Sequence, residues 1–209
     1  MSTPGFDPTG ATVYGLDIET DTTAGGGLDP ANARVVAVAV AGDSWHRVLE
    51  GSEEQLLCEL DAALYELDAG VIVTWNGARF DLPFLADRAR ACGVHWGLVL
   101  TPDDQRTSHR DPLPGHVGGY RAAWHDHQHL DAYQVYRADV GASLGLPCGL
   151  KQLSRFVGLH PVEVDRTKIH ALSRHELAEY VASDAILTRE LALRRWSTAH
   201  LAIDQVSSS

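Results

Sequence analysis

Three short segments of the sequence place carboxylates where they could hold a divalent cation. In the first, residues 15–20 (Gly-Leu-Asp-Ile-Glu-Thr), an apolar strand pattern gains two acidic residues at positions i and i+2. Alternate residues of a strand point to the same face, so Asp17 and Glu19 should converge on one patch. Two like charges placed so close repel each other, and a cation between them would remove that penalty. The pair could instead be a polar strand end that enters a turn.

The second segment, residues 75–85, reads Trp-Asn-Gly-Ala-Arg-Phe-Asp-Leu-Pro-Phe-Leu. It predicts a strand that ends in a tight Asn-Gly turn and continues into a helix at Asp81. Phe80 and Phe84 should anchor this turn in the core, which leaves Asp81 at the edge where strands end and ligands bind. A role as helix N-cap would also account for Asp81, and the two roles can coexist.

The third segment contains Tyr180 and Asp184, four residues apart in an expected helix. Residues i and i+4 lie on one helix face, so a phenol and a carboxylate can reach one site together. Such a pair is common on helices without any function. The Tyr180–Asp184 pair therefore indicates a functional site only in combination with the other two segments.

The elements that must position these residues alternate between strands and helices. Apolar runs and turn signals predict strands at 12–18, 34–41, 44–49, 71–75 and 128–130, and helices at 52–70, 81–92, 131–138, 150–157 and 173–202. Ser173 and Glu176 match a capping box at the start of the last helix. This order indicates an α/β fold with a mixed central sheet flanked by helices.

Length and composition favour one soluble domain. The chain has 209 residues, 44% hydrophobic and 22% charged, so we expect a single domain over 1–209. We expect residues 1–10 and 204–209 to be flexible and 101–124, rich in Pro, Gly and His, to form a long mobile loop. No apolar run approaches the ~20 residues of a membrane span, and no leader pattern begins the chain. We therefore expect a cytoplasmic protein with no membrane partner, in which the three separated cysteines are free thiols.

The charge balance restricts how the chain could meet nucleic acid. There are 17 Lys and Arg residues against 28 Asp and Glu residues, a formal charge of −11. This excludes a protein that holds long nucleic acid through a broad basic face. An enzyme whose metal ions supply the positive charge remains compatible with it.

Taken together, the three segments resemble the tyrosine subclass of the DEDD 3′-to-5′ exonucleases, in the RNase H-like superfamily. Asp17-x-Glu19 resembles the first exonuclease motif, Asn76-x-x-x-Phe80-Asp81 the second, and Tyr180-x-x-x-Asp184 the third. The resemblance runs from about residue 12 to residue 194. It is closest to the proofreading domains of family-B DNA polymerases and their stand-alone relatives, in which a segment similar to residues 129–131 (His-Leu-Asp) also recurs.

The resemblance implies an RNase H-like fold and two Mg²⁺ or Mn²⁺ ions per site. Asp17, Glu19 and Asp184 would hold the ion that activates water, and Asp17 would bridge to a second ion with Asp81 in its shell. Tyr180 would orient the attacking water. The expected activity is removal of nucleoside 5′-monophosphates from the 3′ ends of single-stranded DNA or RNA, with any polymerase or repair partner left open.

Five further residues are candidates for contact with the substrate. Thr20, Asn76 and Phe80 stand within or beside the motifs, while Lys151 and Arg155 form an i, i+4 basic pair on an expected helix that could contact phosphates. Exposed basic pairs usually only solvate a surface.

A row of histidines offers a different kind of site. His125, His127, His129 and Asp131 alternate, so in an extended chain they would share one face and could bind a transition metal. A solvated loop edge, ordered only near His129, is the simpler interpretation, and we do not assign a site there.

Two other functions remain compatible with the sequence. One is a non-catalytic nucleic-acid-binding or adaptor module that has kept the fold, although four converging carboxylates without a metal would be destabilising. The other is an RNA-maturation exoribonuclease. RNA and DNA are distinguished by contacts to a 2′-hydroxyl that have no fixed sequence motif, so the sequence leaves this choice open.

Overall fold

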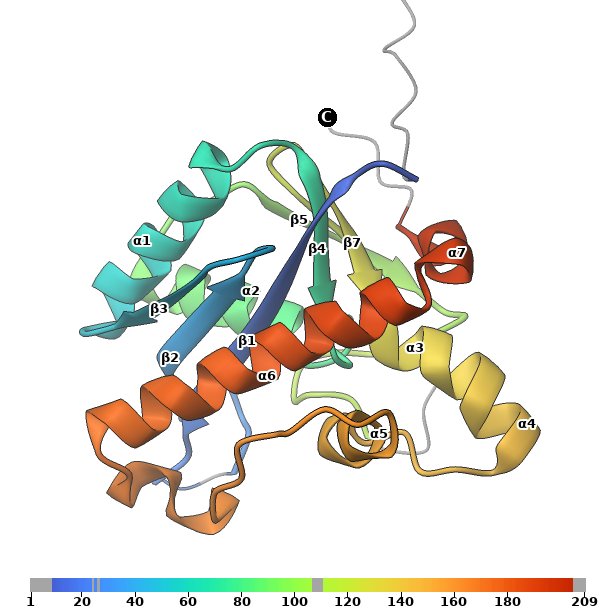
Figure 1. Cartoon of the computed structure of the whole chain (residues 1–209). Helices are drawn as coiled ribbons and strands as arrows, with labels where there is room; N and C mark the ends of the chain where they lie inside the picture. The colour runs from blue at the N-terminus through green and yellow to red at the C-terminus, as the bar shows by residue number, and fades with distance from the viewer. Residues whose placement is uncertain (1–8, 24, 26, 107–110, 205–209) are drawn as a thin grey trace, which may run out of the picture.

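A seven-stranded mixed sheet forms the centre of the molecule (Figure 1), as seen in a computed structural model that describes residues 9–23, 25, 27–106 and 111–204. The strands follow the order β3-β2-β1-β4-β7-β6-β5. Their bounds are β1 Thr12–Asp21, β2 Arg34–Ala41, β3 His46–Glu50, β4 Gly70–Thr74, β5 Leu98–Asp103, β6 Gly119–Trp124 and β7 His127–Asp131. Strands β1, β4 and β7 run parallel, and antiparallel strands extend the sheet on both sides. This confirms the expected α/β fold with a mixed central sheet.

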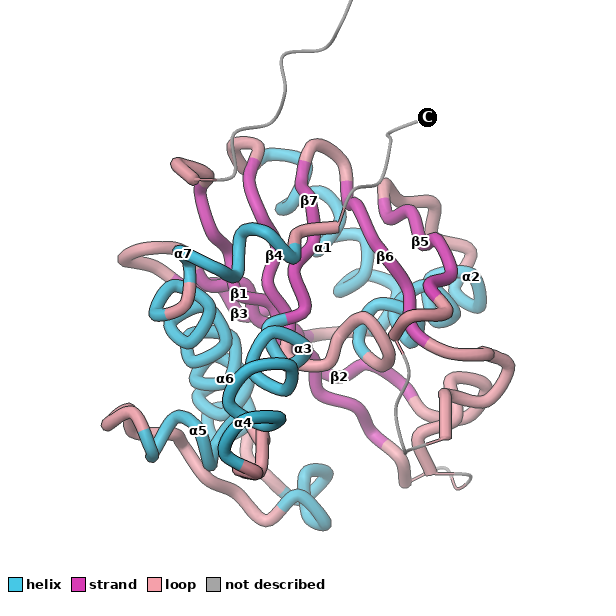
Figure 2. The backbone as a smooth tube through the Cα atoms, turned by 90° about the vertical axis from the view of Figure 1, so that its right-hand side faces the viewer, coloured by secondary structure: helices cyan, strands magenta, loops and turns pink. Residues whose placement is uncertain are grey.

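Helices cover both faces of the sheet. Helices α1 (Glu53–Glu66) and α2 (Asp81–Cys92) lie behind it in Figure 1, and the long helix α6 (Arg174–Arg194) crosses in front of β1 and β2. The shorter helices are α3 (Ala132–Tyr136), η1 (Arg137–Gly141), α4 (Ala142–Leu144), α5 (Leu150–Phe156), η2 (Arg166–Ala171), α7 (Trp196–Ala199) and η3 (His200–Ala202). Figure 2 shows α3, α4 and α5 grouped beside α6. Among the described residues, no helix combines the length and the apolar character that crossing a membrane requires.

Strand β1 is apolar on both faces because both are covered. Leu16 and Ile18 pack into a core with residues of α1 and α2, including Leu60 and Phe84. Val13 points the other way, into a cluster that contains Ala192 of α6. By the same alternation, Asp17 and Glu19 belong to the face that α6 covers.

Small residues let α6 lie close to the sheet. Three alanines of β2 pack against Val181 and Ala185 of α6, in a cluster whose buried members are Ala37, Ala39, Ala41, Val181 and Ala185. On β1 the contact is tighter still, because a Cβ atom built at Gly15 would overlap the carbonyl oxygen of Ala185 and lie 3.0 Å from the Cβ of Arg189. Gly15 therefore sets how closely α6 approaches the strand that carries Asp17.

The prediction of a mobile loop over 101–124 is wrong at both ends of that range. Residues Leu98 to Asp103 pair in register with Trp124 to Gly119, so β5 and β6 form an antiparallel hairpin. The sequence did not predict this hairpin, because Pro102 and the scattered glycines interrupt the apolar alternation that indicates strands. An edge strand accepts a proline, because one side of it has no neighbour that needs an N–H donor, and β5 is the edge strand.

The C-terminal region also differs from expectation. Ser173 forms the predicted capping box with Glu176, but the helix ends at Arg194, and α7 and η3 follow as separate short turns. Asp204, expected to be flexible, is 2% exposed, and its N–H donates to the carbonyl of His129 (2.8 Å). The remainder of the two ends predicted to be flexible, residues 1–8 and 205–209, lies outside the described residues, whereas residues 9 and 10 form an exposed turn.

Replacing Gly15 by alanine should push α6 away from β1. Overpacking of this kind costs about 1–3 kcal/mol in free energy of unfolding, and each kcal/mol lowers Tm by about 2–4 °C in a chain of this size. Gly10→Ala is the matched control, since no atom lies within 4 Å of a Cβ at that position. Thermal melting of both variants checks the expectation, and equal Tm values would contradict it.

Candidate active site

Three carboxylates meet where β1 passes under α6. Asp17, Glu19 and Asp184 each offer one oxygen, and these three atoms lie within 4.8 Å of one another. Glu19 and Asp184 are buried and Asp17 is half-buried. The β1–β2 register shifts between Glu19 and Thr20, so the strand is irregular directly after the acidic pair. Such irregularities are common next to functional sites, because they redirect side chains.

Helix α6 contributes Tyr180 and Asp184, one turn apart, as the helical spacing predicts. Their side chains are almost completely buried, with residue exposures of 1% and 2%. A buried carboxylate on a helix that faces two more carboxylates has no structural benefit of its own, because each added charge raises the cost of burial.

Asp81 reaches the same region from the turn that follows β4. Asn76 adopts a left-handed conformation (φ 68°), and Phe80 packs its ring against Phe84 with centroids 5.6 Å apart. The helix α2 begins at Asp81, so Phe80 and not Asp81 occupies the N-cap position, contrary to the alternative role considered for Asp81. Capping therefore does not explain this buried carboxylate.

The carboxylates act strongly on one another. Burial raises the pKa of Asp17 well above its usual value, and Asp184, Glu19 and Asp81 raise it further in that order, while Lys151 lowers it. All four acidic residues of the three motifs thus belong to one electrostatic cluster. Carboxylate oxygens without nitrogen or sulfur donors suit hard cations such as Mg²⁺ and Mn²⁺, so the donor set fits the implied ions.

Lys151 of α5 supplies positive charge to this cluster. Its ammonium group forms an ion pair with Asp184, donates to the carbonyl of Val162 (2.8 Å) and lies 4.3 Å from the centroid of the Tyr180 ring. The sequence suggested Lys151 as a phosphate contact, and the structure places it at the acidic cluster. In the metal-free chain it partly neutralises Asp184.

The other candidate substrate contacts differ in position. Thr20 and Phe80 are half-buried beside Glu19 and Asp81, and Asn76 shapes the turn through its backbone. Arg155 instead forms an exposed ion pair with Glu163 (2.7 Å). The structure therefore gives Arg155 a surface role.

The interpretation of the histidine row as a solvated loop edge is wrong. His127 and His129 are buried in β7, where the carbonyl of Leu64 accepts a hydrogen bond from His127 and Thr74 and Asp204 flank the ring of His129. His125 contacts Asp61 (2.9 Å) from the preceding turn. Among the described residues, the three carboxylates above form the group with metal-binding geometry, and the histidines do not join it.

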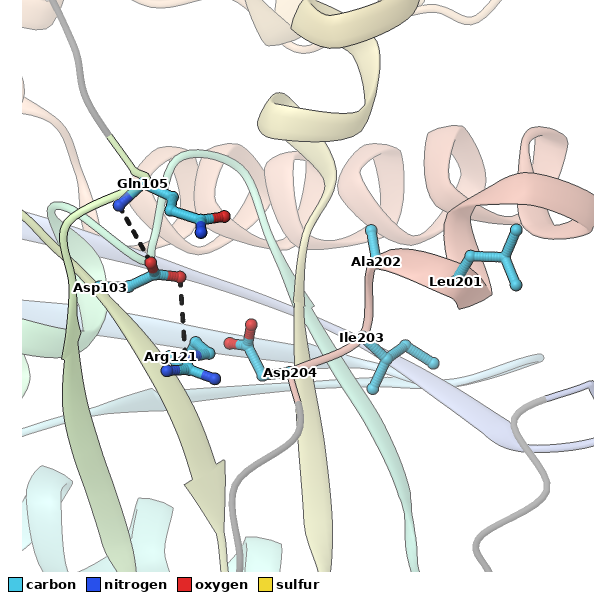
Figure 3. A pocket seen from close by; sticks show the side chains of 7 residues that line it. All are labelled: Asp103, Gln105, Arg121, Leu201, Ala202, Ile203 and Asp204. Carbon is cyan, nitrogen blue, oxygen red and sulfur yellow. Dashed lines mark hydrogen bonds and ion pairs between the residues drawn. The ribbon is translucent and has the colours of Figure 1, made fainter.

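A cavity of about 300 Å³ lies away from these carboxylates, at the end of the described chain (Figure 3). Its walls combine the β5–β6 hairpin with the last residues of the C-terminal region, namely Asp103, Gln105, Arg121, Leu201, Ala202, Ile203 and Asp204. Asp103 and Arg121 pair with each other across it, so its charges are already matched. The acidic cluster therefore remains the candidate site.

Two comparisons with known proteins found matches to this chain. Residues 46–143 match the family model described as DNA polymerase family B, exonuclease domain. The solved structure of the family B DNA polymerase from the hyperthermophilic archaeon Pyrobaculum calidifontis matches with a TM-score of 0.66 and 22% sequence identity, over 92% of this chain. The chain therefore has an RNase H-like α/β fold, with a mixed seven-stranded sheet flanked by helices. No curated protein matches the sequence.

The family-model match covers just under half of the chain, and the structural match shows the fold. The chain spans about a quarter of the polymerase, since 25% of that protein is covered. The match to the exonuclease domain model includes Asp81 but not Asp17, Glu19 or Asp184. In the folded chain Asp81 is linked to the other carboxylates through its electrostatic effect on Asp17.

Lys151→Met should destabilise the metal-free chain, because it leaves the buried Asp184 without its ammonium partner. Removing one partner of a buried ion pair costs about 3–5 kcal/mol, and the partial exposure of Lys151 places this pair at the lower end. Mn²⁺ should restore most of that loss by taking over the neutralisation. Urea unfolding with and without Mn²⁺ measures both effects, with the exposed Arg155→Met as control. A loss that Mn²⁺ leaves unchanged would show that Lys151 acts through packing alone.

The raised pKa of Asp17 predicts a specific pH dependence. Below the unfolded-state pKa of about 4, Asp17 is protonated in both states and costs nothing. Between that value and the raised folded-state pKa, the folded chain binds more protons, so its stability falls as pH rises. Asp17→Asn removes this titration, and its stability advantage over the parent should grow from pH 4 upward and then level off.

Urea unfolding of the metal-free parent and of Asp17→Asn across this range measures the difference. Saturating Mn²⁺ should cancel the advantage, because the ion binds the parent carboxylates in the native state. A difference that does not vary with pH would contradict the electrostatic origin.

Proposed function

We propose that this chain is a metal-dependent 3′-to-5′ exonuclease that hydrolyses single-stranded DNA or RNA to nucleoside 5′-monophosphates. The observation that carries the proposal is the convergence of Asp17, Glu19 and Asp184 within 4.8 Å, with Tyr180 one helical turn before Asp184. The matched family model and the polymerase fold supply the direction and class of the reaction.

In this proposal Asp17, Glu19, Asp81 and Asp184 hold two divalent ions. Such ions neutralise the phosphate charge and favour deprotonation of the attacking water. The chain itself must keep four carboxylates at one place, and β1, α2 and α6 each contribute rigid backbone to that task. Rigid support matters because displacement of a reacting group by an ångström lowers rates severely.

Tyr180 is proposed to orient the attacking water. Its ring is fixed by burial against α5, where the Lys151 ammonium lies on its face. The hydroxyl is thus carried by a side chain with little freedom, which is the condition for a preorganised hydrogen bond. Lys151, already beside Asp184, is proposed to contact the scissile phosphate when substrate is present.

The formal charge of −11 favours short or frayed single-stranded ends as substrates. Without a broad basic face, affinity for long duplex should be weak, and few phosphate contacts should make the salt dependence shallow. Whether the backbone is DNA or RNA follows from contacts to the 2′ position, so both belong in the test.

The test uses 5′-labelled single-stranded DNA and RNA with the parent protein, Tyr180→Phe and Tyr136→Phe. The parent should shorten labelled strands stepwise from the 3′ end with Mg²⁺ or Mn²⁺ and stop in chelator. Tyr180→Phe should lower the single-turnover rate by roughly 10²-fold, since one hydrogen bond at the reacting centre is lost. Tyr136→Phe is the matched control, because it removes another buried hydroxyl, which donates to the Leu191 carbonyl (3.0 Å).

Tyr180→Phe should retain stabilisation by Mn²⁺, because the phenol is not among the proposed metal ligands. Cleavage at the parent rate would remove Tyr180 from the mechanism. Full turnover in chelator would contradict the role of the carboxylates. Stabilisation by Mn²⁺ without any cleavage would favour the non-catalytic binding module.

A further inference from the structure

Asp131, the last residue of β7, is buried at 2% exposure and uses both of its carboxylate oxygens on backbone N–H groups. One oxygen accepts from Asn76 (2.9 Å) and from Tyr133 (3.1 Å), and the other accepts from Ala78 (3.3 Å). Tyr133 belongs to the helix that Asp131 itself caps. The bonds from Asn76 and Ala78 come from a different segment, the turn between β4 and α2.

That turn has little freedom of its own. Asn76 is held at a positive φ, and a Cβ at Gly77 would overlap the side chain of Thr74. Ala78 is completely buried, and its carbonyl accepts from the N–H of Tyr120 (2.9 Å) in β6. The peptide groups around Ala78 are thus held from β7 on one side and from β6 on the other.

The turn leads directly to Asp81, three residues after Ala78. The N–H of Leu82 donates to the carbonyl of Gly77 (3.0 Å), so the first turn of α2 is joined to the segment that Asp131 holds. A shift of this segment would move Asp81 relative to Asp17. Asp131 itself is not placed to bind an ion, because N–H donors occupy both of its oxygens.

The pKa of Asp131 lies above its usual value because the residue is buried, and its neighbours offset only part of that rise. Burial raises the pKa of Asp131, while His129, Arg106 and the N–H donors of Asn76 and Ala78 lower it. His129 is in turn hydrogen-bonded to Asp204 (2.8 Å), which also pairs with Arg106. Asp131 therefore lies next to a polar network formed by His129, Asp204 and Arg106.

We propose that Asp131 is the positioning residue for Asp81, acting through the Asn76–Ala78 turn to fix where Asp81 stands in the acidic cluster. This rests on the proposed function in one respect, the assignment of Asp81 to the second ion. The hydrogen bonds themselves do not depend on that assignment.

The variant Asp131→Asn tests the proposal with little change of volume. Its amide oxygen can keep the bonds to Asn76 and Tyr133, but the amide nitrogen then faces the N–H of Ala78 and that bond is lost. Two measurements follow on the full chain: amide hydrogen exchange over residues 76–82 without metal, and calorimetric titration with Mn²⁺. We expect faster amide exchange in the turn. We also expect a roughly tenfold higher Kd for the second Mn²⁺ ion, with the Kd of the first ion unchanged.

Asp61→Asn is the matched control. Asp61 of α1 likewise accepts three hydrogen bonds, all at one oxygen, from Gly97 (2.9 Å), Trp124 (2.8 Å) and His125 (2.9 Å), and these donors lie near the start of β7 and not at its end. The amide oxygen that Asp61→Asn introduces can keep all three bonds, so this variant removes a charge alone and should leave both Mn²⁺ affinities as in the parent. Asp81→Asn should weaken the second ion by itself, and combining it with Asp131→Asn should add nothing, because both act on one group.

Three results would overturn the proposed role of Asp131, and a fourth would separate that role from the proposed function. Parent-like exchange in Asp131→Asn overturns the proposal, and so does an additive double variant or an equal loss of the second ion in Asp61→Asn. If the parent binds no Mn²⁺ while exchange in the turn still rises in Asp131→Asn, then the proposed function fails and the hold of Asp131 on the turn stands.

Discussion

The close approach of α6 to β1 is the constraint on which the site depends. A side chain at Gly15 would overlap the carbonyl of Ala185, so the missing Cβ lets the helix backbone lie directly on the strand. Asp17 follows Gly15 by one step of strand alternation, and Asp184 is the neighbour of Ala185. The contact that sets the helix against the sheet therefore also sets the spacing of the carboxylates, and the alanines of β2 continue the same close packing.

This packing brings buried carboxylates close together, and other groups at the site offset part of the resulting repulsion. Carboxylates held close in a buried place repel one another, and the folded backbone leaves them no room to separate. Lys151 offsets part of the repulsion at Asp184, and backbone N–H groups hold Asp131 nearby. The remaining negative charge lowers the stability of the metal-free chain, and the divalent cations of the proposed function would neutralise it.

The sequence predicted those parts of the site whose geometry is local. Strand alternation placed Asp17 with Glu19, and helical spacing placed Tyr180 with Asp184. It could not predict that Lys151 pairs with Asp184, that Gly15 receives α6, or that Asp131 holds the turn before Asp81, because each of these joins segments far apart in the chain. The same limit explains the errors: the β5 strand and the buried His127 depend on neighbours that no short window contains.

The order of the elements along the chain has a consequence during translation. The ribosome releases β1 and β2 early, whereas α6, which covers one face of both strands, is made late. In a nascent chain that lacks α6, the alanine face of β2 is therefore uncovered. Asp17 and Glu19 are then exposed, because Asp184 of α6 has not yet been synthesised. Such intermediates expose apolar surface and strand edges, the features that chaperones recognise. The acidic cluster cannot assemble before synthesis has passed Asp184, so an incomplete nascent chain lacks the metal-binding geometry of the finished domain.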